Sequence, residues 1–223
     1  MMTVEQNLRL TETGPGTPMG DLLRRYWWPI AATIDLDAEP VQPVRLLSED
    51  MTLFRSLKGE FGLIAKSCAH RAINLAYGIP QENGLRCAYH GWTYNTEGKV
   101  IDMPFEPACL PLKVKSYAVE ELGGLIWAYL GPEPAPLLPR YEILVRPGIR
   151  SAWSVALPCN WLQCHENSMD PLHFQWLHRY WGGWKLSKLF KTDAERAFWN
   201  DRVGSRGADH RRLGFEATSY GVI

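Results

Sequence analysis

Two short stretches decide the fold: Cys68-Ala69-His70 and Cys87-Ala88-Tyr89-His90, with residues 71–86 between them. Each stretch holds one Cys and one His within the length of a single tight turn. If the two turns meet in the folded chain, they place two thiolates and two imidazoles around a common point. Thiolates and imidazoles are ligands that suit transition metals, so the pattern indicates a metal or metal-cluster site.

Two kinds of site use this ligand set. In a Rieske [2Fe-2S] cluster two Cys hold one iron and two His hold the other, whereas in a structural zinc site four side chains surround one ion. Zinc folds usually pair Cys with Cys in one loop and His with His in the next, but both loops here are mixed. The sequence therefore favours a cluster that relays electrons, with zinc as the alternative. The expected cluster ligands are Cys68, His70, Cys87 and His90.

Composition excludes several classes of partner. The chain has 223 residues, 24 basic and 24 acidic side chains, and 46% apolar residues, which is enough for a hydrophobic core. Its net charge of zero provides no basic field for nucleic acid or for an anionic membrane, so neither is expected as a partner. No run approaches the ~18 consecutive apolar residues of a membrane span.

The cysteine count and the polar start of the chain bear on its location. Five Cys is an odd number, which makes a disulfide framework a poor explanation. Residues 1–15 lack the basic start, apolar core and cleavage site of a secretion signal. We therefore expect a cytoplasmic protein.

Short apolar runs broken by turn residues predict an antiparallel β domain over residues 41–131, after an N-terminal segment, 1–40, with a short helix over Met19–Trp28. Residues 132–150 are rich in Pro and predict a linker. The remainder, 151–223, is expected to begin a second, α+β domain. The runs are Val44–Leu47, Met51–Phe54, Phe61–Ala65, Leu85–Tyr94, Val100–Met103, Tyr117–Val119 and Leu125–Tyr129.

The second domain is expected to start with a strand over Ser151–Leu157, followed by a helix over Asn160–His178. A last strand is expected near the end of the chain. Its inward face would carry Leu213, Phe215, Ala217 and Ser219.

The predicted helix carries a second candidate site. His173 and His178 are five residues apart, so in a regular helix they point about 140° away from each other. Both can bind one metal only if the helix ends near Trp176 or if a wide i to i+5 turn brings them together. Two His and a carboxylate with open positions is the arrangement of non-heme Fe(II) oxygenases, and a relay cluster needs such an acceptor.

Asp170 has two possible roles. It lies one turn before His173, where it can accept a ring N–H from a His and connect the two centres. Alternatively, it is a helix-start carboxylate ahead of Pro171.

With these motifs, the chain resembles the oxygenase (α) component of Rieske non-heme iron aromatic ring-hydroxylating oxygenases, in the phthalate 4,5-dioxygenase-like branch. The resemblance implies an N-terminal antiparallel β Rieske domain followed by the beginning of an α+β, helix-grip catalytic domain. It also implies a mononuclear Fe(II) on His173 and His178, a homotrimer in which Asp170 bridges this iron to His90 of the neighbouring subunit, and an NAD(P)H-dependent reductase. The motifs are Gly14–Gly20 followed by Leu22–Trp27, Cys68-x-His70-Arg71, Cys87-x-x-His90-Gly91-Trp92 and Asn160–His178.

The chain departs from the family pattern in two places. Ala69 stands where the family often has Pro, which affects the rigidity of the loop and no ligand. The third iron ligand of the family, a carboxylate far downstream, is not identifiable, so we expect a truncated product, a fragment or one part of a split subunit. The carboxylates after His178 are Asp193, Glu195, Asp201, Asp209 and Glu216, none in a matching motif.

Three functions remain open at this point. The first is an oxygenase that takes electrons from a reductase through the cluster to iron and uses O2 to hydroxylate or O-demethylate an aromatic small molecule. The second is a Rieske electron carrier, which leaves the helix over Asn160–His178 unexplained. The third is a subunit that is inactive without a complementary chain. The helix favours the oxygenase.

Overall fold

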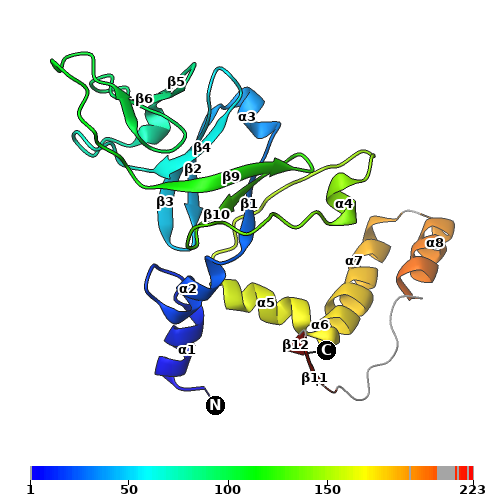
Figure 1. Cartoon of the computed structure of the whole chain (residues 1–223). Coiled ribbons are helices and arrows are strands. Elements are labelled where there is room, and N and C mark those ends of the chain that lie inside the picture. The colour runs from blue at the N-terminus through cyan, green and yellow to red at the C-terminus, as the bar shows by residue number, and fades with distance from the viewer. Residues whose placement is uncertain (1, 191, 205–213, 215, 220, 223) are drawn as a thin grey trace. The chain divides into compact units, whose positions relative to one another are not determined.

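The computed structural model describes residues 2–190, 192–204, 214, 216–219 and 221–222. The chain divides into two compact units, Met1–Ala156 and Leu157–Ile223. The first is built mainly from antiparallel strands and the second mainly from helices, which confirms the expected order of β structure before helical structure (Figure 1).

The N-terminal unit contains a six-stranded antiparallel sheet in the order β1-β10-β9-β4-β3-β2. The long hairpin β9–β10 is green in Figure 1, beside the cyan strands β3 and β4. Its strands are β1 (Trp27–Ala32), β2 (Val41–Leu46), β3 (Glu49–Arg55), β4 (Phe61–Ala65), β9 (Ser116–Leu122) and β10 (Leu125–Tyr129).

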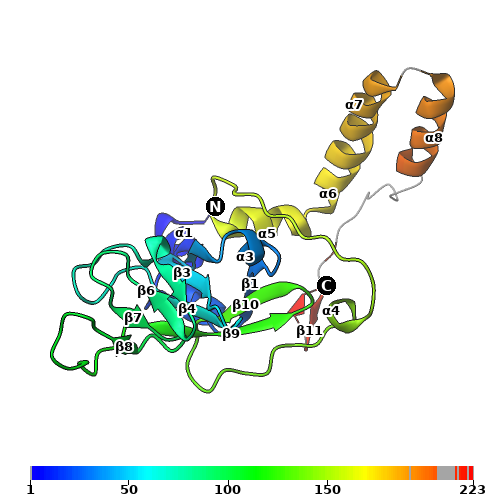
Figure 2. The ribbon, with the colours of Figure 1, turned by 90° about the horizontal axis from the view of Figure 1, so that it is seen from above.

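A smaller four-stranded antiparallel sheet has the order β5-β6-β7-β8 and is labelled most fully in Figure 2. The predicted run Leu85–Tyr94 forms two of its strands, because the Cys87 loop interrupts it. A 3-10 turn, η1 (Leu75–Tyr77), precedes this sheet. The strands are β5 (Ile79–Gln81), β6 (Gly84–Arg86), β7 (Thr93–Tyr94) and β8 (Val100–Asp102).

Strands β3 and β4 are buried on both faces. Leu53 and Leu63 point into one core cluster, which also includes Ile126 of β10. Their neighbours Phe54 and Ile64 point to the opposite face, into a second cluster shared with the small sheet. A strand that is buried on both faces has a continuous apolar run of residues. For this reason the apolar runs in the sequence predict these two strands. The second cluster contains both expected cysteine ligands, Cys68 and Cys87.

The N-terminal segment contains three short helices, α1 (Val4–Thr11), α2 (Pro18–Leu23) and α3 (Asp35–Ala38), and strand β1. The predicted helix over Met19–Trp28 is shorter than expected, because Trp27 and Trp28 pair with β10 instead. The β domain therefore starts before residue 41. Residues 132–150 include one helical turn, α4 (Glu142–Val145), and the Trp27 indole donates a hydrogen bond to the Pro136 carbonyl at 2.8 Å.

Arg24 connects the N-terminal segment to the large sheet. Its side chain is only 8% exposed and donates to the carbonyls of Thr13 and Leu47 at 2.8 and 2.9 Å, and to Glu49 at 2.7 Å. The other Glu49 oxygen accepts from Lys115 at 2.7 Å and from the Tyr117 hydroxyl. Burial by itself raises the pKa of Glu49, but the hydrogen bonds from Lys115, Tyr117 and Arg24 outweigh it and lower the pKa below its ordinary value.

The strand predicted over Ser151–Leu157 does not form: this segment has no regular structure, and residues 151–156 belong to the N-terminal unit. The segment Asn160–His178 is helical, as predicted, but the type of helix changes along it. Farther along the chain, α7 and α8 lie side by side in Figures 1 and 2. Of the predicted last strand, Ala217 is in a short strand, while Leu213 and Phe215 lie outside the described residues. The elements are α5 (Trp161–Met169), α6 (Pro171–His173), η2 (Phe174–Trp181), α7 (Gly182–Leu189), α8 (Asp193–Gly204), β11 (Ala217–Thr218) and β12 (Gly221–Val222).

Within the described part of the chain, no helix combines the length and the apolar character needed to cross a membrane.

We expect Arg24→Ala to lower the free energy of unfolding of the N-terminal unit by about 3 kcal/mol, because it leaves the Glu49 carboxylate without its most buried cationic partner. Urea denaturation followed by tryptophan fluorescence measures this. The matched control is Arg45→Ala, which removes a 2.9 Å pair with Asp50 whose arginine side chain is 70% exposed. Exposed pairs contribute less than about 1 kcal/mol, so equal losses in the two variants would contradict the assignment.

Candidate metal centres

The first expected ligand loop, residues 68–73, is closed by two backbone hydrogen bonds. The Cys68 N–H donates to the Ile73 carbonyl at 2.9 Å, and the Ala72 N–H donates to the Cys68 carbonyl, also at 2.9 Å. Ala72 has φ +54°, a left-handed conformation that costs a residue with a Cβ roughly 1 kcal/mol. The loop follows β4 and is rigid because its first residue is tied at both backbone groups.

The second ligand loop, residues 87–92, repeats this pattern. The Cys87 N–H donates to the Trp92 carbonyl at 2.8 Å, and the Gly91 N–H donates to the Cys87 carbonyl at 3.1 Å. Gly91 occupies the left-handed position with φ +77°, and a Cβ there would lie 3.1 Å from the Pro104 ring. The loop connects β6 to β7. Both loops thus present a Cys as the first residue of the same closed turn.

The two cysteine side chains are buried next to each other, at 4% and 3% exposure for Cys68 and Cys87. Burial raises the pKa of the Cys87 thiol, and the adjacent Cys68 sulfur raises it further. The backbone N–H groups of Tyr89 and His90 point at the Cys87 sulfur and act in the opposite direction, without reversing the rise in pKa. Two adjacent buried thiols lose both protons readily only when a cation binds between them.

Tyr94 in β7 forms a hydrogen bond with Cys68 of this sulfur pair. Its hydroxyl lies 3.1 Å from Cys68 Sγ and accepts the Ala69 N–H at 3.0 Å. Because the amide occupies an acceptor position on the oxygen, the hydroxyl proton is available for the sulfur. Burial raises the pKa of Tyr94 well above its ordinary value, as does the sulfur beside it, so the phenol stays protonated.

The two imidazoles lie together on the outer side of the loops. The ring centroids of His70 and His90 are 4.6 Å apart, and His70 stacks on Trp92 at 4.9 Å with an interplanar angle of 10°. Burial lowers the pKa of His90, and the charges of His70 and Arg71 lower it further. A neutral imidazole is the form that binds a metal ion.

The structure therefore sorts the four side chains by type, with two sulfurs inside and two imidazoles outside. This arrangement fits a [2Fe-2S] cluster of the Rieske kind, which needs a thiolate pair for one iron and an imidazole pair for the other. Among the described residues, no three Cys, His, Asp or Glu side chains converge closely enough to hold a single metal ion.

The second candidate site lies in the C-terminal unit. Residues Phe174–Trp181 form a π-helix, η2, which is the wide-turn alternative considered from the sequence. A π-helix turns more slowly per residue than an α-helix, so side chains five apart come to the same side. The ring centroids of His173 and His178 are 5.2 Å apart at 72°. Both imidazoles are thus available to one ion.

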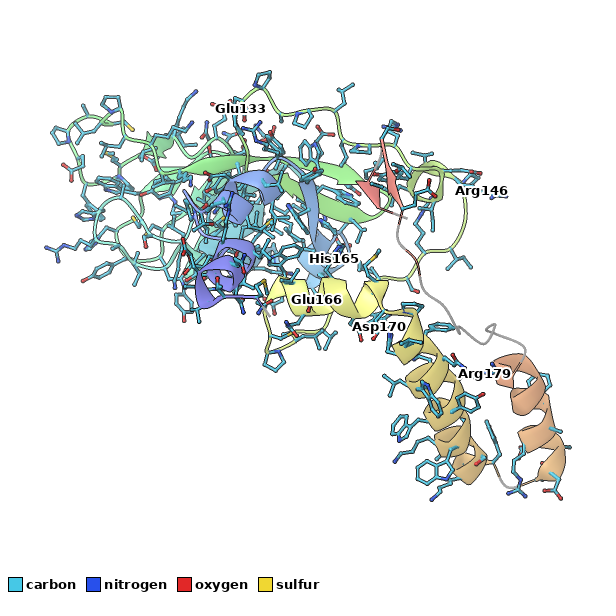
Figure 3. The ribbon with its side chains drawn as sticks, turned by 90° about the horizontal axis from the view of Figure 1, so that it is seen from below. Glu133, Arg146, His165, Glu166, Asp170 and Arg179 are labelled. Carbon is cyan, nitrogen blue, oxygen red and sulfur yellow. The ribbon has the colours of Figure 1, made fainter. Side chains whose placement is uncertain are left out.

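Asp170 lies where the chain passes from α5 to α6, as Figure 3 shows. Its Oδ1 accepts the N–H groups of Leu172 and His173 at 2.9 and 3.3 Å, which makes it the N-cap of α6. The Asp170 carbonyl also contacts His173 Nδ1. If Nδ1 donates this bond, His173 Nε2 carries the lone pair and faces away from the backbone, as in histidines that bind metals.

Comparison with known proteins decides between the kinds of metal centre. Residues 26–118 match the model of the Rieske [2Fe-2S] domain, a range that contains both ligand loops. The chain is 42% identical over 229 residues to the 5,5'-dehydrodivanillate O-demethylase oxygenase subunit of Sphingobium sp. (strain NBRC 103272 / SYK-6), covering 99% of this chain and 51% of that protein. The chain contains a Rieske [2Fe-2S] domain, and over nearly its whole length it is similar to part of an oxygenase subunit.

Other Rieske oxygenases give the same result. The chain is 37% identical to the phthalate 4,5-dioxygenase oxygenase subunit of Pseudomonas putida, covering 80% of this chain and 42% of that protein. Among solved structures, dicamba monooxygenase bound to dicamba superposes with a TM-score of 0.63 at 27% identity, over 70% of this chain and 48% of that one. The chain spans about half the length of the curated relatives it matches.

The cofactor of the N-terminal unit is therefore the iron-sulfur cluster of a Rieske domain rather than zinc. Two contacts around it, those of Tyr94 and Trp92, were not predicted from the sequence. The position of Tyr94 is a weak indication of its contact, because it lies two residues after Trp92 and residues two apart in an extended segment lie on the same side. The stacking of Trp92 on His70 had no signal in the sequence, because it depends on two loops meeting in space.

Proposed function

We propose that this chain is the electron-relaying and iron-binding part of a Rieske oxygenase component. In this function, electrons from a reductase pass through the cluster to a mononuclear Fe(II), where O2 is used to hydroxylate or O-demethylate an aromatic substrate. The observation that carries the proposal is the sorting of buried thiols and outer imidazoles in two equivalent loops, together with the pairing of His173 at the end of α6 with His178 of η2.

In this proposal Cys68 and Cys87 hold the inner iron of the cluster, and His70 and His90 hold the outer one. When bound, the cluster supplies a one-electron relay whose potential is raised by the two neutral ligands. The protein holds the cysteine ends rigid through the backbone bonds of both loops. It leaves His70 exposed on the outer side of the loops.

His173 and His178 are the proposed ligands of the mononuclear iron. The contact between His173 Nδ1 and the Asp170 carbonyl orients the ring, so that Nε2 is the ligand atom. When bound, Fe(II) supplies open positions at which O2 can be activated. The chain holds both imidazole rings on one side of the continuous helix that α6 and η2 form.

The bridging role of Asp170 is also part of the proposal, as is a homotrimer. Both hydrogen bonds of the α6 cap use Oδ1, and within the described residues Oδ2 has no partner. The same carboxylate can therefore cap its helix and still accept an N–H from an imidazole of a neighbouring subunit, such as His90. The two roles that the sequence left as alternatives are compatible.

The proposed location is the cytoplasm. Five Cys is an odd number that does not fit a disulfide framework, as is usual for proteins of a reducing compartment.

Cluster content tests the first part of the proposal. Chain isolated without oxygen is expected to contain two irons and two acid-labile sulfides, with visible absorbance that bleaches on reduction. Cys87→Ser is expected to lose all of them, because a buried hydroxyl cannot replace the thiolate. Cys109→Ser, at an exposed cysteine outside both loops, is the matched control and should keep the full content. Retention of the cluster by Cys87→Ser would refute the ligand assignment.

Iron beyond the cluster tests the second part. Fe(II) added anaerobically is expected to bind as a third iron, and His178→Ala should abolish this binding while leaving sulfide and the cluster absorbance unchanged. His165→Ala removes an exposed imidazole of α5 whose ring centroid lies 5.8 Å from that of Trp161, and it serves as the control. Equal loss of iron in both variants would mean that the pair on η2 is structural.

Tyr94→Phe is expected to lower the midpoint potential of the cluster on the order of 50 mV. The hydroxyl donates to Cys68 Sγ, and a bond to a sulfur ligand favours the more negative, reduced state. A hydrogen bond contributes about 1 kcal/mol, and a one-electron potential changes by about 59 mV for each tenfold change in equilibrium constant. Redox titration followed by electron paramagnetic resonance measures the change. Tyr89→Phe, an exposed tyrosine of the second loop, should leave the potential nearly unchanged.

A further inference from the structure

Two cysteines outside the cluster loops form a close pair. The sulfurs of Cys159 and Cys164 lie 3.6 Å apart, and both are free thiols. The pair is at the start of α5 and belongs entirely to the C-terminal unit. Neither thiol has a role in the proposed metal centres.

The helix cap explains why the two thiols are close. Asn160 is the N-cap of α5, and its side chain accepts the N–H groups of Leu162 and Gln163 at 3.1 and 3.3 Å. Cys159 is the residue just before the cap, and Cys164 is the fourth residue of the helix. These are the two positions that pack together in a hydrophobic staple, where the cap fixes the angle at which the chain enters the helix. The proximity is therefore imposed by the backbone.

The pair is also accessible, unlike the other close cysteine pair of the chain. Cys159 is exposed and Cys164 is half-buried, whereas Cys68 and Cys87 are both buried. Cys109 is exposed too, but its sulfur contacts backbone carbonyls and no second thiol. Only the pair on α5 combines access for a small oxidant with a second sulfur in reach.

We propose that Cys159 and Cys164 are a site of reversible oxidation, which closes to an intramolecular disulfide in the presence of a hydroperoxide. This inference does not depend on the proposed function. One sulfur, as its thiolate, attacks the peroxide; the O–O bond breaks and leaves a sulfenic acid and hydroxide. The second sulfur attacks the sulfenic sulfur, the S–S bond forms and water leaves. In sum, two thiols and one hydrogen peroxide give one disulfide and two waters.

Closure requires only a small movement. The sulfurs must approach from 3.6 Å to about 2.05 Å, a change within the range of side-chain rotation in Cys. The new bond would join the residue before the cap to the first turn of α5. It would hold that turn closed, since the chain could no longer unwind at Asn160. The opposite end of α5 leads directly to Asp170 (Figure 3).

The test uses the purified, cluster-loaded chain, treated with an equimolar amount of hydrogen peroxide and then with N-ethylmaleimide. Trypsin releases both cysteines on one peptide, residues 151–179, because no Lys or Arg lies between Arg150 and Arg179. We expect this peptide to lose two hydrogens and take no maleimide after oxidation. Dithiothreitol before labelling should restore two maleimides.

Matched variants separate the pair from general thiol damage. Cys109→Ser should still form the disulfide, whereas Cys164→Ser should not, and its Cys159 should remain open to labelling after dithiothreitol. Two maleimides on peptide 151–179 after peroxide, or a disulfide from either cysteine to another chain, would overturn the proposal.

A second measurement detects the effect on the helix. Hydrogen exchange of the amides of residues 162–166 should become several-fold slower in the oxidised chain and should not change in peroxide-treated Cys164→Ser. Equal exchange in the oxidised and reduced chain would mean that the disulfide does not hold the first turn.

Discussion

The structure of the N-terminal unit depends on one constraint: two sulfur atoms must lie side by side where water is excluded. Cys68 and Cys87 meet this constraint because each is the first residue of a loop that is closed by hydrogen bonds at both its N–H and its carbonyl. The sulfurs are part of the same apolar cluster as Phe54 and Ile64 of the large sheet. The core that holds the two sheets together is therefore also the wall of the metal site.

Much of this could be predicted from the sequence, for a physical reason. The Cys and His spacing defines two turns, and strands buried on both faces, such as β3 and β4, have long apolar runs with few alternative structures. The start of the domain was harder to predict. Trp27 and Trp28 follow an amphipathic pattern, but they pair with β10, a partner that lies about a hundred residues away in the chain.

The turn between β2 and β3 shows a second limit. Leu47 and Ser48 both have positive φ, +46° and +64°, as a type I′ turn requires, yet neither is a typical residue for that turn. The conformation is supported from outside, since Arg24 donates to the Leu47 carbonyl. In the same way, the sequence left two arrangements open for His173 and His178. Only the backbone of η2 distinguishes them, because helix type depends on how neighbouring turns pack rather than on the identity of the two residues.

The two ligand loops are alike in their hydrogen bonds but differ by one residue in where they carry the imidazole. His70 is the second residue after its Cys, and His90 is the third. This offset removes the symmetry between them: His70 is exposed and lies flat on Trp92, while His90 is half-buried against Tyr89. One imidazole of the pair is therefore exposed and the other is half-buried. Water can reach the imidazole of His70 more freely than that of His90. The two imidazole ligands therefore have different surroundings, although the ligands of the centre come in matched pairs.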